Sequence, residues 1–183
     1  DYPIGAKRVL FNDDYYPALN RANVRLVTDR IERIEAAGVR TRDGELVAAD
    51  VIIYATGFQA TDFLAPMTIT GAGGRSLRDE WQAGARAYLG VTVSGFPNLF
   101  MLYGPNTNLG HNSILVMIEA QVGYIIDAIR QLDARKRRRL DVRRDVMDAY
   151  NAWLQKDLAK SVWAADKQSW YKLADGTITN NWP

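Results

Sequence analysis

An apolar run that ends in a glycine turn constrains the fold of this chain more than any other segment. Residues 51–58 read Val-Ile-Ile-Tyr-Ala-Thr-Gly-Phe. Consecutive apolar residues without alternation are typical of a strand that is covered on both faces, as in the parallel sheets of nucleotide-binding folds. Gly57 then permits a sharp turn and a close backbone approach. The run therefore predicts a buried strand over residues 51–55 in an α/β fold.

A second block combines an apolar strand, a glycine-containing break and the start of a long helix. Residues 99–103 predict the strand, and Gly-Pro-Asn at 104–106 breaks it. Asn112 or Ser113 can cap a helix from about residue 113 to residue 135, whose apolar positions recur at steps of three and four. The start of such a helix offers free backbone N–H groups and the positive end of the helix dipole. This arrangement suits an anionic group of a ligand.

Shorter elements are predicted around these two blocks. Strands are expected over residues 24–27, 31–35, 39–42, 46–47 and 88–91, with Asp43-Gly44 as a hairpin turn. Helices are expected over residues 13–20, 76–81 and about 145–162. Short strands plus two long C-terminal helices are therefore the expected composition of the fold.

Three segments of the chain resemble flavin-dependent Baeyer–Villiger monooxygenases. They are Ala-Thr-Gly at 55–57, Phe-Pro-Asn at 96–98 with Gly-Pro-Asn-Thr at 104–107, and Tyr-Pro-Ile-Gly-Ala-Lys-Arg at 2–8. The resemblance extends to Ser-Trp-Tyr at 169–171 and is greatest to the 4-hydroxyacetophenone-monooxygenase-like branch. It implies a FAD- and NADPH-dependent enzyme that inserts one oxygen atom from O₂ into a small-molecule ketone.

The same resemblance implies roles for individual residues. It places Arg8 over the flavin as the catalytic group, where a permanently charged guanidinium can stabilise a negatively charged peroxyflavin. It assigns Lys7 to the 2′-phosphate of NADPH and Trp170 to the nicotinamide cofactor. The other cofactor candidates are Thr56, Gly57, Asn106 and the backbone N–H of Ile114, and the substrate-side candidates are Leu109 and His111.

Plainer interpretations remain open for several of these residues. Lys7 can be a solvated cation and Trp170 a packed aromatic residue, and His111 can serve as a structural hydrogen-bonding group. Thr56 and Gly57 can simply end a strand. The basic run at 135–139 has no interleaved aromatic residue and follows a helix C-terminus, where cations complement the dipole. It predicts a solvated helix end and no nucleic-acid partner.

No Gly-x-Gly-x-x-Gly fingerprint occurs in the chain, although the family carries one for FAD and one for NADPH. We therefore expect the C-terminal part of a two-dinucleotide-binding-domain flavoprotein. Residues 1–58 would end the NADPH-binding domain and return to the FAD domain. Residues 59–183 would form the C-terminal part of the FAD domain with a helical cap and tail. The alternatives are a flavin monooxygenase that oxygenates N or S, and a catalytically inactive, self-associating fragment.

Composition narrows the remaining classes. A chain of 183 residues with 48% hydrophobic content can bury a core, and its net charge of +2 requires no acidic partner. No run of 18 apolar residues occurs, so no membrane span is predicted, and the expected location is cytoplasmic. The absence of cysteine excludes disulfides and a redox-active cysteine pair, and no metal site is predicted. Strand edges without partners predict weak FAD binding and a homo-oligomer for the chain alone.

Overall fold

The computed structural model describes residues 3–110, 112–166, 169 and 171–183, in two units. One unit consists of residues 1–9 and 59–183, and the other consists of residues 10–58. The predictions on His111 and Trp170 lie outside the described residues.

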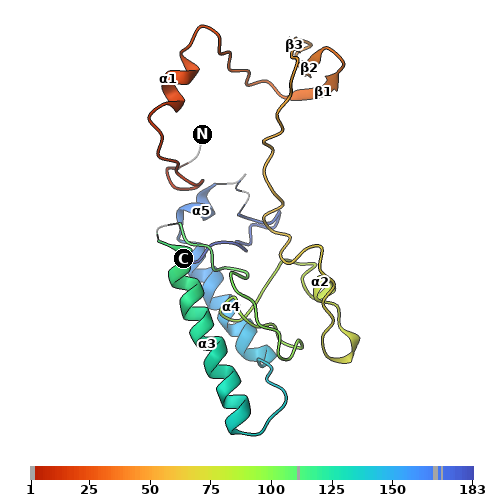
Figure 1. Ribbon diagram of the computed structural model, residues 1–183, viewed down its shortest axis with the longest axis vertical. Coiled ribbons are helices and arrows are strands. Elements are labelled where there is room, and N and C mark those ends of the chain that lie inside the picture. Colours follow the sequence, from red (N-terminus) through yellow and green to blue (C-terminus); the bar gives the residue numbers. More distant parts are fainter. Residues whose placement is uncertain (1–2, 111, 167–168, 170) are drawn as a thin grey trace. The chain divides into compact units, whose positions relative to one another are not determined.

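The unit of residues 10–58 contains a short helix and a small antiparallel sheet (Figure 1). Helix α1 spans Tyr15–Leu19, and strands β1 (Ile31–Glu35), β2 (Gly38–Thr41) and β3 (Leu46–Ala48) pair in the order β1-β2-β3. The predicted hairpin turn is confirmed, with Gly44 at φ 93°. Arg40 of β2 donates two hydrogen bonds, from Nε and Nη2, to the carboxylate of Glu35 in β1. These bonds lower the pKa of Glu35 to about 2.

The predicted buried strand over residues 51–55 is wrong for this structure. The segment carries no strand, and the side chains of Val51 and Ile53 are 78% and 85% exposed. A strand needs a neighbour that takes up its backbone N–H and C=O groups, and the described residues pair no strand with this segment. The predicted strand over residues 24–27 is absent for the same reason.

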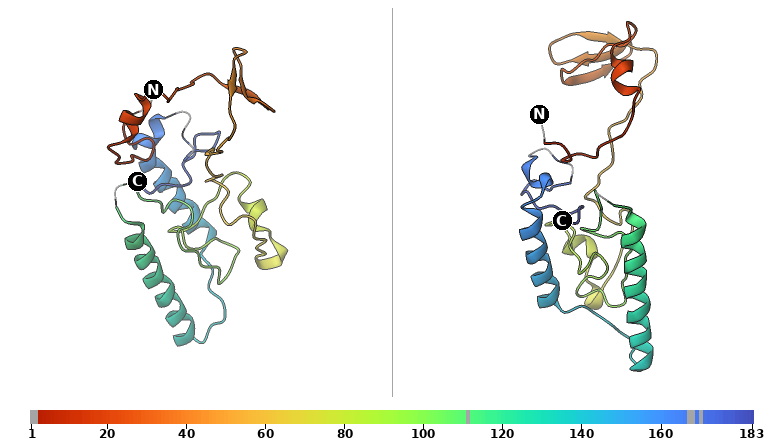
Figure 2. Two further views of the ribbon diagram at one scale, coloured as in Figure 1. Left: turned by 45° about the horizontal axis from the view of Figure 1, so that its top comes forward. Right: turned by 90° about the vertical axis from the view of Figure 1, so that its left-hand side faces the viewer.

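The unit of residues 1–9 and 59–183 is built from helices and tightly packed loops. Its helices are η1 (Ala72–Gly74), α2 (Leu77–Glu80), α3 (Ile114–Ala134), α4 (Arg144–Leu158) and α5 (Val162–Ala165). Helices α3 and α4 run in opposite directions (Figures 1 and 2). Met147 of α4 packs on a buried loop core that includes Val93, Phe96 and Met101. No described helix combines the length and apolar character needed to span a bilayer.

Local signals set the helix ends of this unit. The predicted long helix is confirmed as α3, whose N-cap Ser113 accepts a hydrogen bond through Oγ from the backbone N–H of Leu115. The predicted second helix is confirmed as α4 but ends earlier than expected. Ser161 donates from Oγ to the carbonyl of Leu158 at 2.6 Å and then precedes the separate helix α5. A serine that bonds to nearby backbone in this way competes with helix continuation.

The predicted strands over residues 88–91 and 99–103 are also wrong. Residues Tyr88 and Thr92 form an isolated bridge around a tight turn, in which Leu89 and Gly90 have φ values of 54° and 67°. Tyr103 has a φ of 56° at the end of the second segment. A strand cannot continue through left-handed residues, because their backbone leaves the extended region. These segments therefore form loops, which bring residues 104–108 into the interior.

Candidate active site

Residues 104–108 pair with the segment 178–182, which lies far away in the sequence. The backbone N–H of Asn106 donates to the Thr179 carbonyl at 2.8 Å, and that of Asn108 donates to the Asn180 carbonyl at 2.9 Å. Asn108 and Asn181 form a parallel bridge. Asn106, Asn108 and Asn181, here called the asparagine cluster, are all buried, with 3%, 9% and 1% of their surfaces exposed. Buried amides of this kind fix a backbone because each must find hydrogen-bond partners.

Asn106 holds the two segments together through its side chain. Its Nδ2 donates to the carbonyls of Ile178 at 2.7 Å and Asn181 at 3.1 Å. Its φ of 57° lies in the left-handed region, which asparagine tolerates better than most residues. The amide hydrogens of this cofactor candidate are therefore engaged within the protein.

Arg8 is tied to the asparagine cluster. Its Nη2 donates to Oδ1 of Asn108 at 3.4 Å, across 100 positions of sequence. The same Oδ1 accepts from the Tyr103 hydroxyl at 2.9 Å, and Nδ2 of Asn108 donates to Oδ1 of Asn181 at 3.0 Å. The Arg8 side chain itself is exposed. A fixed positive charge thus stands at the edge of a buried amide network.

The first turn of α3 presents a backbone donor that bonds to none of the described residues. The Ser113 N–H donates to Oδ1 of Asn112 at 2.7 Å, and the Leu115 N–H is taken by Ser113 Oγ. The N–H of Ile114 has no acceptor among the residues that the structure describes. Further along α3, Gln121 accepts from the Tyr103 N–H through Oε1 at 2.9 Å and so holds the helix against the loop. The N–H of Ile114, together with the helix dipole, suits an electron-rich ligand atom.

The remaining candidates differ in their surroundings. Leu109 is buried and Lys7 is half-buried, both in the same unit as Arg8. Thr56 and Gly57 are exposed and belong to the unit of residues 10–58. Gly57 has a φ of 84°, which accounts for glycine at this turn. The functional roles of these residues stay predictions.

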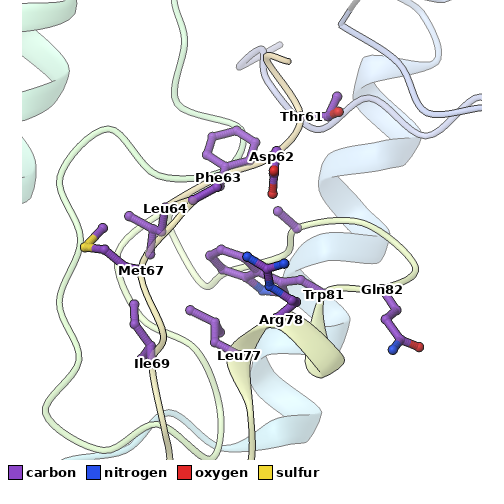
Figure 3. Close-up of a pocket in the computed structure, with 12 residues that line it drawn as sticks. Thr61, Asp62, Phe63, Leu64, Met67, Ile69, Leu77, Arg78, Trp81 and Gln82 are labelled. Atoms are coloured by element: carbon purple, nitrogen blue, oxygen red, sulfur yellow. The ribbon is translucent and has the colours of Figure 1, made fainter. Parts of the chain in front are cut away.

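Two cavities of the structure are not lined by any of the candidate site residues that the structure describes. Figure 3 shows one of about 200 Å³, where Phe63 and Leu64 from a loop face Leu77 and Trp81 of the α2 region, and no candidate residue lines it. A second cavity of about 160 Å³ lies along α3 and is mainly apolar. Its lining includes Gln121 and Tyr124, and burial raises the pKa of the Tyr124 hydroxyl.

Comparison with known proteins extends over the whole chain. The FAD-binding monooxygenase ktnD of Aspergillus niger is 52% identical over 188 residues, and the match covers 100% of this chain and 31% of that protein. A Baeyer–Villiger monooxygenase of Pseudomonas aeruginosa is 44% identical, with 100% of this chain and 35% of the relative covered. Among solved structures, OTEMO in complex with FAD and NADP matches 100% of this chain and 34% of that chain, at 30% identity and a TM-score of 0.87.

The chain is homologous to flavin-dependent Baeyer–Villiger monooxygenases. An oxidised steroid monooxygenase bound to NADP agrees, with 34% identity, a TM-score of 0.84 and 98% of this chain and 35% of that chain covered. The expected resemblance to these enzymes and the α/β fold class are thereby confirmed. The chain spans about a third of the length of the curated Baeyer–Villiger and FAD-binding monooxygenases that it matches. No family profile matches the chain.

In this Baeyer–Villiger homologue, the sequence did not predict the residues whose hydrogen bonds hold the candidate site residues in place. Asn108 directly follows the recognised Gly-Pro-Asn-Thr motif, but neither Tyr103 nor Asn181 carried a signal of its own. Asn181 lies 73 positions from Asn108, and no local periodicity reports a pairing over that distance. Gln121 could have been noticed as a polar residue on a mainly apolar helix, because buried polar side chains need partners.

Proposed function

We propose that the chain forms part of a FAD- and NADPH-dependent monooxygenase that inserts one oxygen atom from O₂ next to the carbonyl carbon of a small-molecule ketone. In this reaction O₂, NADPH, a proton and the ketone give an ester, NADP⁺ and water. The observation that carries the proposal is the Arg8 guanidinium held by Asn108 beside the loop that leads to α3. A permanent positive charge at that position suits chemistry in which negative charge develops on oxygen.

The residues around the start of α3 fit a flavin. FAD, once bound and reduced by NADPH, supplies the oxygen activation, and the protein binds and orients it. The open N–H of Ile114 would hold a flavin carbonyl, with the loop from Asn106 onward shaping the approach. Leu109 and His111 would face the substrate. Lys7 would hold the 2′-phosphate of NADPH, with Trp170 near the nicotinamide end.

Several parts of the proposal rest on the family resemblance. Thr56 and Gly57 would form the linking turn between the end of the NADPH-binding domain, residues 1–58, and the FAD domain, residues 59–183. A cytoplasmic location and self-association of the chain are predictions from the sequence itself. The second candidate function is oxygenation of N or S by a related flavin monooxygenase. Arg8 favours the ketone reaction, because attack by a nucleophilic heteroatom requires no comparable anion stabiliser.

The test is Arg8→Ala in the flavoenzyme that contains this chain. We expect ester formation from ketones to fall by about 10²–10³-fold, the cost of removing one electrostatic stabiliser, with the FAD absorption spectrum unchanged. Product would be measured by mass spectrometry with ¹⁸O₂ as the oxygen source. Arg130→Ala, at an exposed position of α3, is the matched control and should retain full activity. Near-normal ester formation by Arg8→Ala would rule out the assigned role.

A further inference from the structure

We propose that Asn108 is a positioning residue, whose side-chain oxygen holds the Arg8 guanidinium while Tyr103 and Asn181 fix the direction of that oxygen. The proposal rests on the proposed function, in which Arg8 is the catalytic group. It adds a residue that acts through Arg8 and requires no contact of its own with the flavin or the substrate.

The hydrogen-bond chemistry allows only one orientation of the Asn108 amide. Arginine has five N–H donors and no acceptor, so Arg8 must face the oxygen of Asn108. On the other side, Nδ2 of Asn108 donates to the side-chain oxygen of Asn181, which is 1% exposed. A reversed amide would set NH₂ against the guanidinium, and it would keep its contact with Asn181 only if the Asn181 amide reversed as well. Unpaired buried polar groups are costly, so the network keeps Asn108 in one orientation.

Arg8 needs such an anchor because its side chain is long and exposed. Two residues before it, Ala6 is 0% exposed and donates its N–H to the Pro3 carbonyl at 3.1 Å. A free arginine side chain nevertheless samples many rotamers. A displacement of about 1 Å in a catalytic group can cost on the order of 10² in rate. Asn108 thus supplies the positional accuracy that the exposed side chain lacks.

The anchor reaches into a part of the chain far from Arg8. Asn181 accepts from Asn108 through its side chain, and its carbonyl accepts from Asn106 Nδ2 at 3.1 Å. Tyr103 donates to Asn108, and its own N–H is held by Gln121 of α3. Helix α3 and the segment 178–182 therefore both determine where the guanidinium lies.

The decisive experiment is a double-mutant cycle in the flavoenzyme that contains this chain. Asn108→Leu should lower ketone turnover by at least tenfold and raise the share of NADPH oxidation that ends as H₂O₂. FAD content and the rate of flavin reduction should not change. In the Arg8→Ala background, Asn108→Leu should cause no further loss of turnover, because the group through which it acts is gone. Losses that multiply in the double variant would overturn the proposal.

Controls separate positioning from general damage to the fold. Asn151→Leu removes another buried amide of the same unit, which donates to the Ala87 and Met147 carbonyls, and should leave the H₂O₂ share unchanged. Asn108→Asp keeps an oxygen toward Arg8 and should restore most of the turnover lost in Asn108→Leu. Tyr103→Phe removes only a hydroxyl from a side chain that is 47% exposed, so it should fold and still raise the H₂O₂ share. An unchanged share in Tyr103→Phe would contradict the role of Tyr103.

A readout without turnover tests the same contact. In ¹⁵N-arginine NMR of the flavin-free protein, guanidinium N–H exchange at Arg8 should be at least threefold faster in Asn108→Leu than in the unchanged protein. Equal exchange rates would overturn the proposal. If the unchanged enzyme oxygenates no ketone, the proposed function fails. The exchange measurement then still decides whether Asn108 holds Arg8.

Discussion

At the scale of single residues, two glycines allow the loops of the candidate site to cross. A Cβ on Gly104 would lie 2.3 Å from the Gly90 carbonyl oxygen, and one on Gly90 would lie 2.0 Å from Cγ2 of Thr107. Gly90 also has a φ of 67°, which side-chain-bearing residues rarely adopt. The close approach of these two backbones sets the path of residues 104–108 toward the asparagine cluster.

Gly104→Ala should therefore destabilise the protein. The added methyl group meets a backbone atom that cannot move aside easily, and overpacking of this kind costs about 1–3 kcal/mol. Chemical denaturation followed by circular dichroism would measure the loss. Gly123→Ala in α3 is the matched control, because a Cβ there meets nothing within 4 Å. It should stabilise the helix by about 0.5–1 kcal/mol, and equal effects of the two substitutions would contradict the steric explanation.

At the scale of elements, an ion pair joins α2 to α4. Arg144 of α4 donates to Glu80 of α2, and Arg75 lies 3.7 Å from the same carboxylate. The Glu80 side chain is 16% exposed, so the pair is partly shielded from water. The hydrogen bond from Arg144 holds the pKa of Glu80 below its ordinary value of 4.5. The contribution to stability is therefore complete above pH 4.5 and is lost as the pH falls through the lowered pKa.

Glu80→Gln should consequently lower the free energy of unfolding at pH 7 by about 1.5–3 kcal/mol, the usual range for a charge-assisted hydrogen bond. As the pH falls from 7 to 2 the difference from the unchanged protein should shrink, because Glu80 takes up a proton when the pH passes through its lowered pKa. Urea denaturation at both pH values gives the comparison. Asp145→Asn breaks an exposed pair with Arg143 and should cost much less, because solvent screens such a pair. A loss in Glu80→Gln that does not depend on pH would contradict this account.

Elements with local signals could be predicted from the sequence, and elements that need distant partners could not. The start of α3 was predicted because Ser113 caps it through its own neighbourhood. The strand over residues 51–55 was predicted from apolar content, which says nothing about a pairing neighbour. The same limit applies to the site. A motif pointed to Arg8 and Asn106, whereas the partnership of Asn108 with Asn181 arises only from the folded chain.

At the scale of the whole molecule, apolar surface is exposed on both units. Val51, Ile53 and Phe58 are exposed in one unit, and Leu115 and Val116 of α3 are exposed in the other. Clusters of exposed apolar residues are typical of surfaces that associate. The chain also lacks the glycine-rich loop that binds the diphosphate of FAD.

We therefore expect these 183 residues, produced alone, to be colourless and to self-associate. Light scattering after size-exclusion chromatography would give the mass, and the absorbance near the flavin band would give the FAD content. Substitution of Leu115 and Val116 by glutamine should weaken the association if α3 takes part in it. A monomer with stoichiometric FAD would contradict both expectations.

The pairing of residues 106–108 with 178–182 also has a consequence during synthesis on the ribosome. The loop that carries Asn108 leaves the ribosome well before its partner Asn181, which follows 73 positions later. At ordinary elongation rates this delay is roughly 4–15 s. A nascent or prematurely terminated polypeptide that stops before residue 178 would contain Arg8 and the motif at 104–107. It would lack the hydrogen bonds from the segment 178–182 that hold the loop in place. Translation must pass this late segment before the guanidinium can be set in place.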